Sequence, residues 1–297
     1  MDNNTIFTYF YILAFSREGE KQPTLFIAFS FVYLVGVLGN LSIITVTCSD
    51  AHLHTPMYFL LANLSFIDIC YTTTTLPKLL HILLTGNNII SFPECFTQMF
   101  FYSISAQNEG VLLAFMAYDR YVAVCDPLKY HLIINIKKSS LILAGIWTSS
   151  ILNCILITSI TSQLRFCGSN TINQFFCDIK YMAEISCEAV SINYYLYSET
   201  VIFGVLPLLL CVASYTKIIL SILHIKSVTE NHCLRFIIIF YGSAFWMYMR
   251  PPSESKNLNS AFSVLYLGVT PMLNPLIYSL RNKEVKNAVI RIMKQIR

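Results

Sequence analysis

Charged residues are scarce in this chain. Only 12% of the 297 residues are Asp, Glu, Lys or Arg, half of the roughly 25% that is typical of soluble domains, while 55% are hydrophobic. A soluble protein of this size could not cover its surface with so few charges, and the high apolar content excludes intrinsic disorder. The basic residues form no dense patch, so no nucleic-acid partner is expected. The composition predicts an integral membrane protein.

The usual catalytic signatures are also missing. The sequence has no Walker A loop, no G-x-G-x-x-G, no H-E-x-x-H and no G-x-S-x-G, so it indicates no common class of enzyme. No C-x-x-C occurs, and the six histidines are scattered without the spacing that metal sites require. We therefore expect neither catalytic residues nor a resident cofactor.

Long apolar runs are abundant. About 20 apolar residues cross the hydrocarbon core as a helix, and helices satisfy their own backbone hydrogen bonds in lipid. Seven runs qualify, the sixth being the weakest: Leu25–Thr47, Pro56–Leu76, Phe96–Tyr118, Leu141–Ile160, Ile192–Ile225, Leu234–Met249 and Leu258–Leu280. They predict an all-α membrane protein, a single seven-helix domain over residues 1–297, with the bundle at 25–280.

The distribution of Lys and Arg predicts the orientation. With the amino terminus outside, outer segments hold seven of these residues and inner segments thirteen, six of them after residue 280. We therefore expect a multi-pass plasma-membrane protein with residues 1–24 extracellular and 281–297 cytoplasmic. Asn3 begins an Asn-Asn-Thr glycosylation acceptor on the outer side. The basic, amphipathic tail predicts a short helix lying along anionic membrane lipid.

Acidic side chains are expected inside the membrane. Asp68 lies in the middle of the second predicted span and Glu109 in the middle of the third, where ionisable groups are costly and usually functional. Facing one polar interior, they would bind a cation or share a proton; alternatively, each is protonated and hydrogen-bonded between helices. Glu199, near the outer end of the fifth span, either faces an outward cavity or reaches the lipid headgroups.

Four of the ten cysteines fall in predicted outer segments, where an oxidising compartment permits disulfides. They are Cys95, Cys167, Cys177 and Cys187. The even number allows complete pairing, and the sequence alone leaves three connectivities open. The other six lie in predicted membrane or cytoplasmic segments and are expected to stay reduced.

Motifs along nearly the whole chain resemble those of one family. The segment MAYDRYVAVCDPLKY at residues 116–130 resembles the signature of the odorant receptors, a branch of the rhodopsin-like G-protein-coupled receptors. In the same order as in that family occur GN at 39–40, PMYFLLANLSFID at 56–68, SY at 214–215, FYG at 240–242 and PMLNPLIYSLRN at 271–282. The resemblance implies a receptor for small volatile ligands that signals through a stimulatory G protein to adenylate cyclase.

The resemblance also implies roles for individual residues. Cys95 should pair with Cys177, and Cys167 with Cys187. A sodium pocket would involve Asn40, Asp68, Glu109 and Asn274. G-protein coupling and activation would involve Asp119, Arg120, Tyr121, Asn274, Pro275 and Tyr278.

A ligand is expected among the third, fifth, sixth and seventh helices, in a mostly apolar pocket with a few polar groups. Residues of the third helix that share one face are candidates, together with aromatic, acidic and aliphatic residues of the others. The full set is Tyr102, Ser103, Ala106, Gln107, Glu199, Phe203, Tyr241, Phe245, Tyr248, Val264 and Leu267. The alternative is that some of these only pack helices. An ionised Glu199 would favour amines or strong hydrogen-bond donors, and a neutral one carbonyls or alcohols.

One region departs from the family pattern. The family usually carries Lys-Ala-Phe-Ser-Thr-Cys-x-Ser-His at the inner start of the sixth helix, and about eight residues are absent here by our alignment. Leu234–Met249 would form about 24 Å of helix, less than the core thickness of about 30 Å. The shortening predicts impaired folding or coupling, unless the long fifth helix absorbs the loss. A transporter would show internal repeats or paired broken helices, and the chain has neither.

Overall fold

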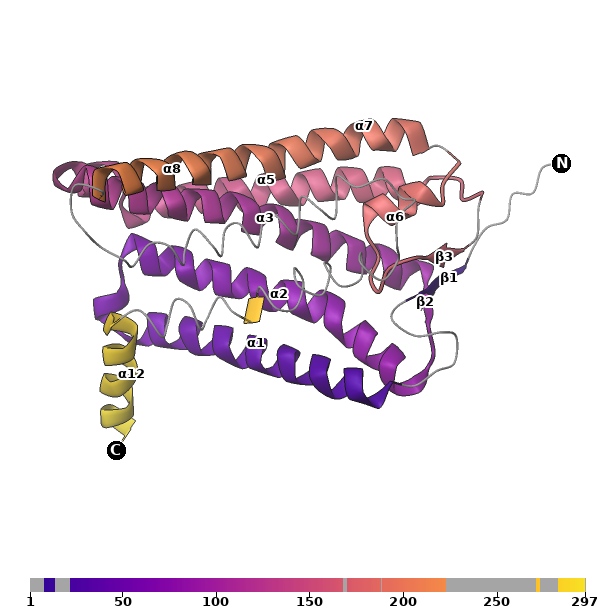
Figure 1. The fold of residues 1–297 in the computed structure, drawn as a ribbon, viewed down its shortest axis with the longest axis horizontal. Coiled ribbons are helices and arrows are strands. Elements are labelled where there is room, and N and C mark those ends of the chain that lie inside the picture. The colour runs from indigo at the N-terminus through magenta and orange to yellow at the C-terminus, as the bar shows by residue number, and fades with distance from the viewer. Residues whose placement is uncertain are drawn as a thin grey trace.

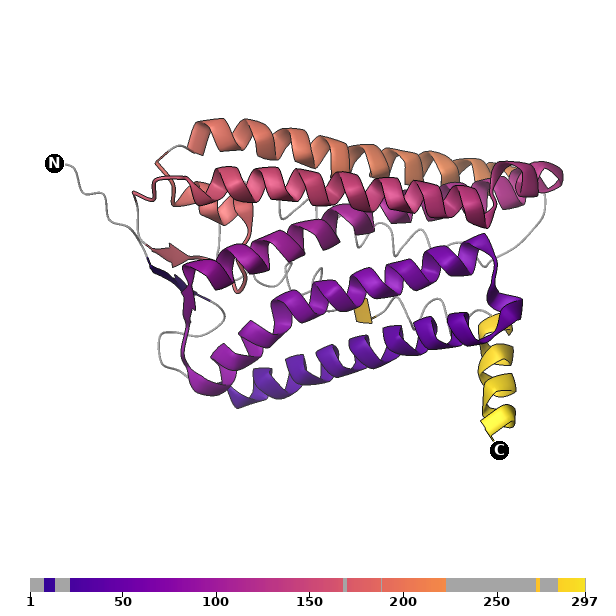
Figure 2. The same ribbon diagram turned by 180° about the vertical axis from the view of Figure 1, so that it is seen from behind.

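A computed structural model of the protein describes residues 8–13, 22–167, 170–187, 189–222, 271–272 and 283–296. Long helical rods run alongside one another in this part of the chain, as Figures 1 and 2 show from opposite sides. The rods are α1 (Pro23–Ser49), α2 (Pro56–Thr85), α3 (Phe92–Cys125), α5 (Ile136–Ser162) and a composite rod of α7 (Ala189–Glu199), the π-helix η3 (Thr200–Val205) and α8 (Leu206–Ile222).

The first five predicted spans coincide with these rods. Four of the rods are long and apolar enough to cross a membrane: α1, α2, α5 and the composite rod over Ile192–Ile218. The most polar rod is α3, which packs against α2, α5 and α8 and buries about half of its residues. The sixth and seventh predicted spans lie outside the described residues, apart from Pro271–Met272. The seven-helix bundle therefore stays a prediction.

Helix α2 is longer than the predicted second span. It continues past Pro77 to Thr85 and ends at Gly86, whose left-handed φ of 77° suits glycine. Proline is tolerated there because neighbouring groups in a membrane bundle can satisfy the backbone carbonyl that it leaves free. Lys78, which the sequence places in an outer segment, is thus on the helix, and its Nζ donates to the carbonyl of Ile89 at 2.7 Å.

A small sheet covers one end of the bundle, so the all-α prediction is wrong in this detail. The strand β1 (Tyr9–Ile12) pairs antiparallel with β2 (Ile89–Ser91) and parallel with β3 (Thr171–Ile172). Phe10, on β1, is fully buried and packs against Phe92 and Phe166. The strands come from three separate segments that the sequence predicts to be extracellular, and they are too short for an alternating pattern to reveal them.

Both disulfides that the family resemblance implies are present at the same end. Cys95, at the start of α3, is bonded to Cys177, with their Cα atoms 5.4 Å apart. Cys167 is bonded to Cys187, with a Cα–Cα distance of 5.2 Å. The first bond ties α3 to the segment between α5 and α7, and the second closes that segment on itself.

Helix α3 approaches the composite rod closely at Gly110. A Cβ atom at this position would lie only 2.7 Å from the backbone carbonyl oxygen of Phe203, which is part of η3. The contact is with backbone, which cannot swing aside as a flexible side chain could. Glycine is therefore required for α3 to pack this closely against η3.

The predicted amphipathic tail forms α12 (Lys283–Ile296), which projects away from the bundle at the end opposite the sheet (Figure 1). Val285 and Ala288 are buried against the bundle, where α12 contacts α1 and the short helix η1 (Ala51–Leu53). The buried positions recur at helical spacing, so one face of α12 is docked.

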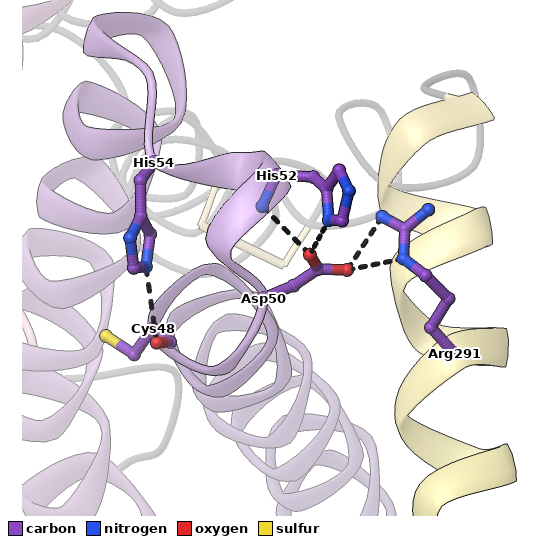
Figure 3. Close-up of polar contacts among 5 residues, drawn as sticks. All are labelled: Cys48, Asp50, His52, His54 and Arg291. Atoms are coloured by element: carbon purple, nitrogen blue, oxygen red, sulfur yellow. Dashed lines mark hydrogen bonds and ion pairs between the residues drawn. The ribbon is translucent and has the colours of Figure 1, made fainter.

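Asp50 joins this tail helix to the turn between α1 and α2, as Figure 3 shows. Its Oδ2 accepts from Arg291 Nε at 2.8 Å and lies 2.7 Å from Arg291 Nη2. Its Oδ1 accepts from the backbone N–H of His52 at 3.0 Å and lies 2.9 Å from His52 Nδ1. The His52 N–H, aided by Arg291, lowers the pKa of Asp50 to about 2 although burial opposes it. The ion pair therefore contributes to stability above the ordinary carboxyl pKa and is lost only as the pH falls through about 2.

We expect replacement of either partner to loosen α12. Asp50→Asn leaves the Arg291 guanidinium without its counter-charge, and Arg291→Ala leaves the buried Asp50 carboxylate with only its contacts to His52. Each variant should lower the melting temperature of the purified protein and speed proteolysis of the tail, and the double variant should be no worse than the more damaging single one. Lys286→Ala, an exposed change on the same helix, is the control. Additive losses in the double variant would contradict a direct interaction.

Candidate functional site

Four side chains from α3, α5 and α7 form what we call the outer polar cluster. Its members are Gln107, Asn153, Tyr195 and Glu199. Glu199 Oε1 accepts from Gln107 Nε2 at 3.0 Å, from Tyr195 OH at 2.8 Å and from Asn153 Nδ2. Tyr195 OH also lies 2.6 Å from Asn153 Oδ1. Glu199 therefore hydrogen-bonds to side chains of the neighbouring helices, and its place in a ligand cavity stays a prediction.

Gln107 contributes an unsatisfied acceptor to this cluster. Its side chain is buried, and its Oε1 has no hydrogen-bond partner among the described residues. A buried carbonyl oxygen without a donor is costly, so a bound molecule that donates a hydrogen bond would be favoured there. Ser103 and Ala106 are two further predicted ligand-binding residues on α3, and both are half-buried.

Sequence reasoning missed Asn153 and Tyr195. Tyr195 precedes Glu199 by four residues and so shares its helix face, a signal that was available. Asn153 is an amide in an otherwise apolar helix, and nothing in the sequence indicates which helix it faces. The way α5 packs against α3 determines which side chains Asn153 meets.

The remaining predicted ligand-binding residues divide into three groups. Tyr102 is fully buried between Tyr71 and Phe176, with ring centroids 5.3 and 4.7 Å away, so it packs α3 against α2 and the outer segment. Phe203 is half-buried in η3 beside Gly110. The other five lie outside the described residues: Tyr241, Phe245, Tyr248, Val264 and Leu267.

An acidic residue that the sequence analysis did not select lies directly after Cys177. Asp178 is 1% exposed, and neither carboxylate oxygen has a hydrogen-bond partner in the described part of the chain. Burial raises its pKa to about 7, against the opposing charge of Lys180. This segment between α5 and α7 is fixed to α3 by Gln98, whose Oε1 accepts from the Cys177 N–H at 2.9 Å.

The predicted sodium-pocket residues occupy the middle of the bundle. Asp68 and Glu109 are both buried, and their carboxyl groups are close enough to interact electrostatically. Asn40 Nδ2 donates to the carbonyls of Gly36 and Pro271, each at 3.0 Å, and its Oδ1 has no partner among the described residues. Asn274 lies outside them. The core thus holds two neighbouring buried carboxyl groups, on α2 and α3, and a buried amide oxygen on α1.

The predicted coupling residues lie at the end of α3 that is remote from the disulfides. Asp119 is buried and accepts from Tyr130 OH at 2.8 Å, whereas Arg120 is exposed. The Tyr121 ring lies 5.3 Å beneath Lys217 Nζ of α8. The other three predicted coupling residues lie outside the described ranges: Asn274, Pro275 and Tyr278.

Comparison with known proteins identifies the family. A family model described as "Olfactory receptor" matches residues 29–296. The chain belongs to the olfactory receptor family. It is 42% identical to the dog olfactory receptor-like protein OLF4 over 97% of each chain. It is 41% identical to human olfactory receptor 7C1, over 99% of this chain and 95% of that protein, and 40% identical to human olfactory receptor 8G1, over 99% and 98%.

Family membership confirms several predictions. Olfactory receptors are multi-pass membrane proteins and G-protein-coupled receptors, not enzymes, so this chain is an olfactory receptor that takes odorant ligands and couples to a G protein. The resemblance drawn from residues 116–130 and the other motifs identified the family correctly.

We expect the stability of this olfactory receptor to depend on Asp178. Because its pKa is raised from 3.8 to about 7 in the folded state, the unfolded chain loses its proton first as the pH rises, and stability falls between about pH 4 and 7. Asp178→Asn should flatten this dependence and raise the melting temperature above pH 7. The gain is at most about 4 kcal/mol.

Melting curves of the detergent-purified receptor between pH 5 and 8 measure this effect. Asp126→Asn controls for the change in net charge. Asp126 is exposed and directly follows α3 at its end remote from the disulfides. Parallel pH profiles for the wild-type receptor and Asp178→Asn would show that Asp178 is not the titrating group.

Proposed function

We propose that this olfactory receptor binds small volatile molecules at the outer polar cluster and signals through a stimulatory G protein to adenylate cyclase. The observation that carries the proposal is the concentration of buried acceptor oxygens at Gln107 and Glu199, between α3 and α7. Polar groups inside an apolar bundle are costly unless they serve recognition or have partners. Family membership supports the coupling part of the proposal.

We place the amino terminus outside the plasma membrane and the carboxyl terminus in the cytosol. The arrangement of the described residues supports this topology, because both disulfides and the sheet lie at one end and the basic helix α12 at the other (Figure 1). Disulfides form in oxidising compartments, and basic residues are favoured beside the anionic inner leaflet. Asn3 would then be accessible for glycosylation.

The acceptors of the outer polar cluster favour ligands that donate hydrogen bonds. Gln107 Oε1 can be satisfied only by a donor, and a carboxylate at Glu199 attracts amines and hydroxyl groups. Asn153 and Tyr195 hold that carboxylate from the side of α5 and α7. We propose that Glu199 orients the ligand and that Ser103, Ala106 and Phe203 form nearby apolar and small contacts.

Glu199→Gln tests this ligand preference, because it keeps the side-chain size and removes the negative charge. We expect the half-maximal concentration of amine and alcohol odorants to rise about tenfold or more, since a hydrogen bond to a charged group contributes about 1.5–3 kcal/mol. Responses are measured as cyclic AMP in cells given a broad odorant panel, with surface expression recorded in parallel. Ser198→Ala, on the exposed side of α7, should respond as the wild type does. An unaltered spectrum for Glu199→Gln would refute the assignment.

We propose that Asp68, Glu109 and Asn40 hold a sodium ion in the core. The residues fit such an ion: two neighbouring buried carboxyl groups and an amide oxygen without a partner among the described residues supply the oxygen ligands that hard cations prefer. The ion would neutralise the buried charges. Asn274 would be a further ligand by resemblance.

Activation, on this proposal, is a population shift toward a conformer whose inner end accepts the G protein. Asp119, held by Tyr130, and the exposed Arg120 lie at that end, with Tyr121 packed against Lys217 of α8. By resemblance, Asn274, Pro275 and Tyr278 complete the relay.

A second candidate function follows from the short segment before Phe240. With only about 24 Å of apolar helix, the sixth span would reach the inner boundary too early, and the receptor would fold or couple poorly. The described part of the chain ends at Ile222 and resumes at Pro271, so this alternative depends on the sequence alone.

Restoring the family's segment of about eight residues before Asn231 tests this alternative. If the shortening impairs the receptor, surface expression and the maximal cyclic AMP response should both rise severalfold. An insertion of Gly and Ser residues of equal length controls for loop length. Unchanged expression and signalling would show that the short segment is fully functional.

A further inference from the structure

A cavity lies at the opposite end of the bundle from the outer polar cluster. We call it the inner pocket; its volume is about 650 Å³, within the range of about 300–1,000 Å³ that is usual for ligand sites. It is bounded by the turn before α2, the end of α3, the short helix α4 (Tyr130–Ile133) and the start of α5. The inference below rests on the proposed topology, in which this end faces the cytosol.

Cationic groups dominate the charge of the inner pocket. Arg120 and Lys137 both line it, and neither side chain forms an ion pair or hydrogen bond with any described residue. His54 and His131 add two imidazole rings. The acidic lining residue is Asp119, whose carboxylate is buried and bonded to Tyr130. Two cations that have no partner in the described part of the chain, beside a cavity, suit a ligand with several negative charges.

The walls of the inner pocket are mostly apolar. Pro56 and Met57 of α2 line one side, and Ile134 and Ile136 line another. Free phosphate or a soluble polyphosphate gains nothing from such walls, whereas a phospholipid can place its glycerol and first acyl carbons against them. Basic pockets between membrane helices on the cytoplasmic side are known to bind inositol phospholipid headgroups. The pocket therefore combines the two properties that a lipid headgroup site needs.

We propose that the inner pocket binds a phospholipid whose headgroup carries phosphomonoester groups, a phosphoinositide, through Arg120 and Lys137. The phosphates contact the guanidinium and the ammonium groups, and the glycerol backbone lies on the apolar wall formed by α2 and the start of α5. Because Arg120 is also a proposed G-protein contact, lipid occupancy and coupling are linked through one side chain.

Direct binding to the detergent-purified receptor tests the proposal without any G protein. Dioctanoyl phosphatidylinositol 4,5-bisphosphate is the probe, dioctanoyl phosphatidylcholine has the same chains without net charge, and inositol 1,4,5-trisphosphate is the soluble headgroup. We expect the first to bind at least about tenfold more tightly than either of the others, as measured by thermophoresis. Equal binding of the phosphatidylcholine would refute a phosphate site, and equal binding of the trisphosphate would refute a lipid site.

A matched pair of lysine variants locates the site. Lys137→Gln should weaken binding of the bisphosphate lipid about tenfold, because one charged contact is lost. Lys129→Gln removes the same charge from the same inner connection at an exposed residue that does not line the pocket, and should leave affinity within about twofold. Lys137→Arg should retain binding.

Equal affinities for Lys137→Gln and the wild type would overturn the proposed site, as would equal losses in the two glutamine variants. If Lys137→Gln does not fold, the comparison of the three ligands on the wild-type receptor and the retained affinity of Lys137→Arg decide the question. A receptor that binds the lipid but gives no cyclic AMP response to any odorant would refute the proposed signalling and leave this inference standing.

Discussion

The need to satisfy polar side chains inside an apolar bundle governs the architecture around α3. Gln98, Gln107, Asn108, Glu109 and Asp119 are buried along this one helix, from its disulfide end to its opposite end. Four of them hydrogen-bond to other elements: Gln98 to α2, Gln107 to α7, Asn108 to α5 and Asp119 to α4. A low-dielectric interior makes unpaired polar groups expensive, so these bonds matter. These bonds fix the rotation of α3 about its axis and its position along the bundle. The outer polar cluster, the Asp68–Glu109 pair and the inner pocket are all positioned relative to α3.

The parts of the structure that follow from local patterns were predictable from the sequence. Hydrophobic run length located the first five rods, four of which are apolar enough to cross a membrane. Glu199 was selected because an acid in an apolar run stands out, and the structure places it among partners. The pairing of Cys95 with Cys177 needed the family resemblance, because spacing alone cannot distinguish three connectivities.

The contacts that could not be predicted join segments that are distant in the chain. Asp50 and Arg291 are separated by 241 positions, and β1 pairs with strands from two other, distant segments. Asn153 carries no signal of which helix it faces. Such pairings depend on how the rods are rotated and tilted, which is a property of the packed bundle and not of any one stretch of sequence.

The π-helix η3 makes the direction of side chains on the fifth rod depend on the exact number of residues in it. A π turn holds about one residue more than an α turn, so the residues before and after η3 face directions offset by about 100° from those of an uninterrupted α-helix. Glu199 immediately precedes it, and the carbonyl of Phe203 within it abuts Gly110. Deleting a single residue there would let the rod revert to α-helical winding and turn the carboxylate away from Gln107. Length in this stretch is consequently as strictly constrained as residue type.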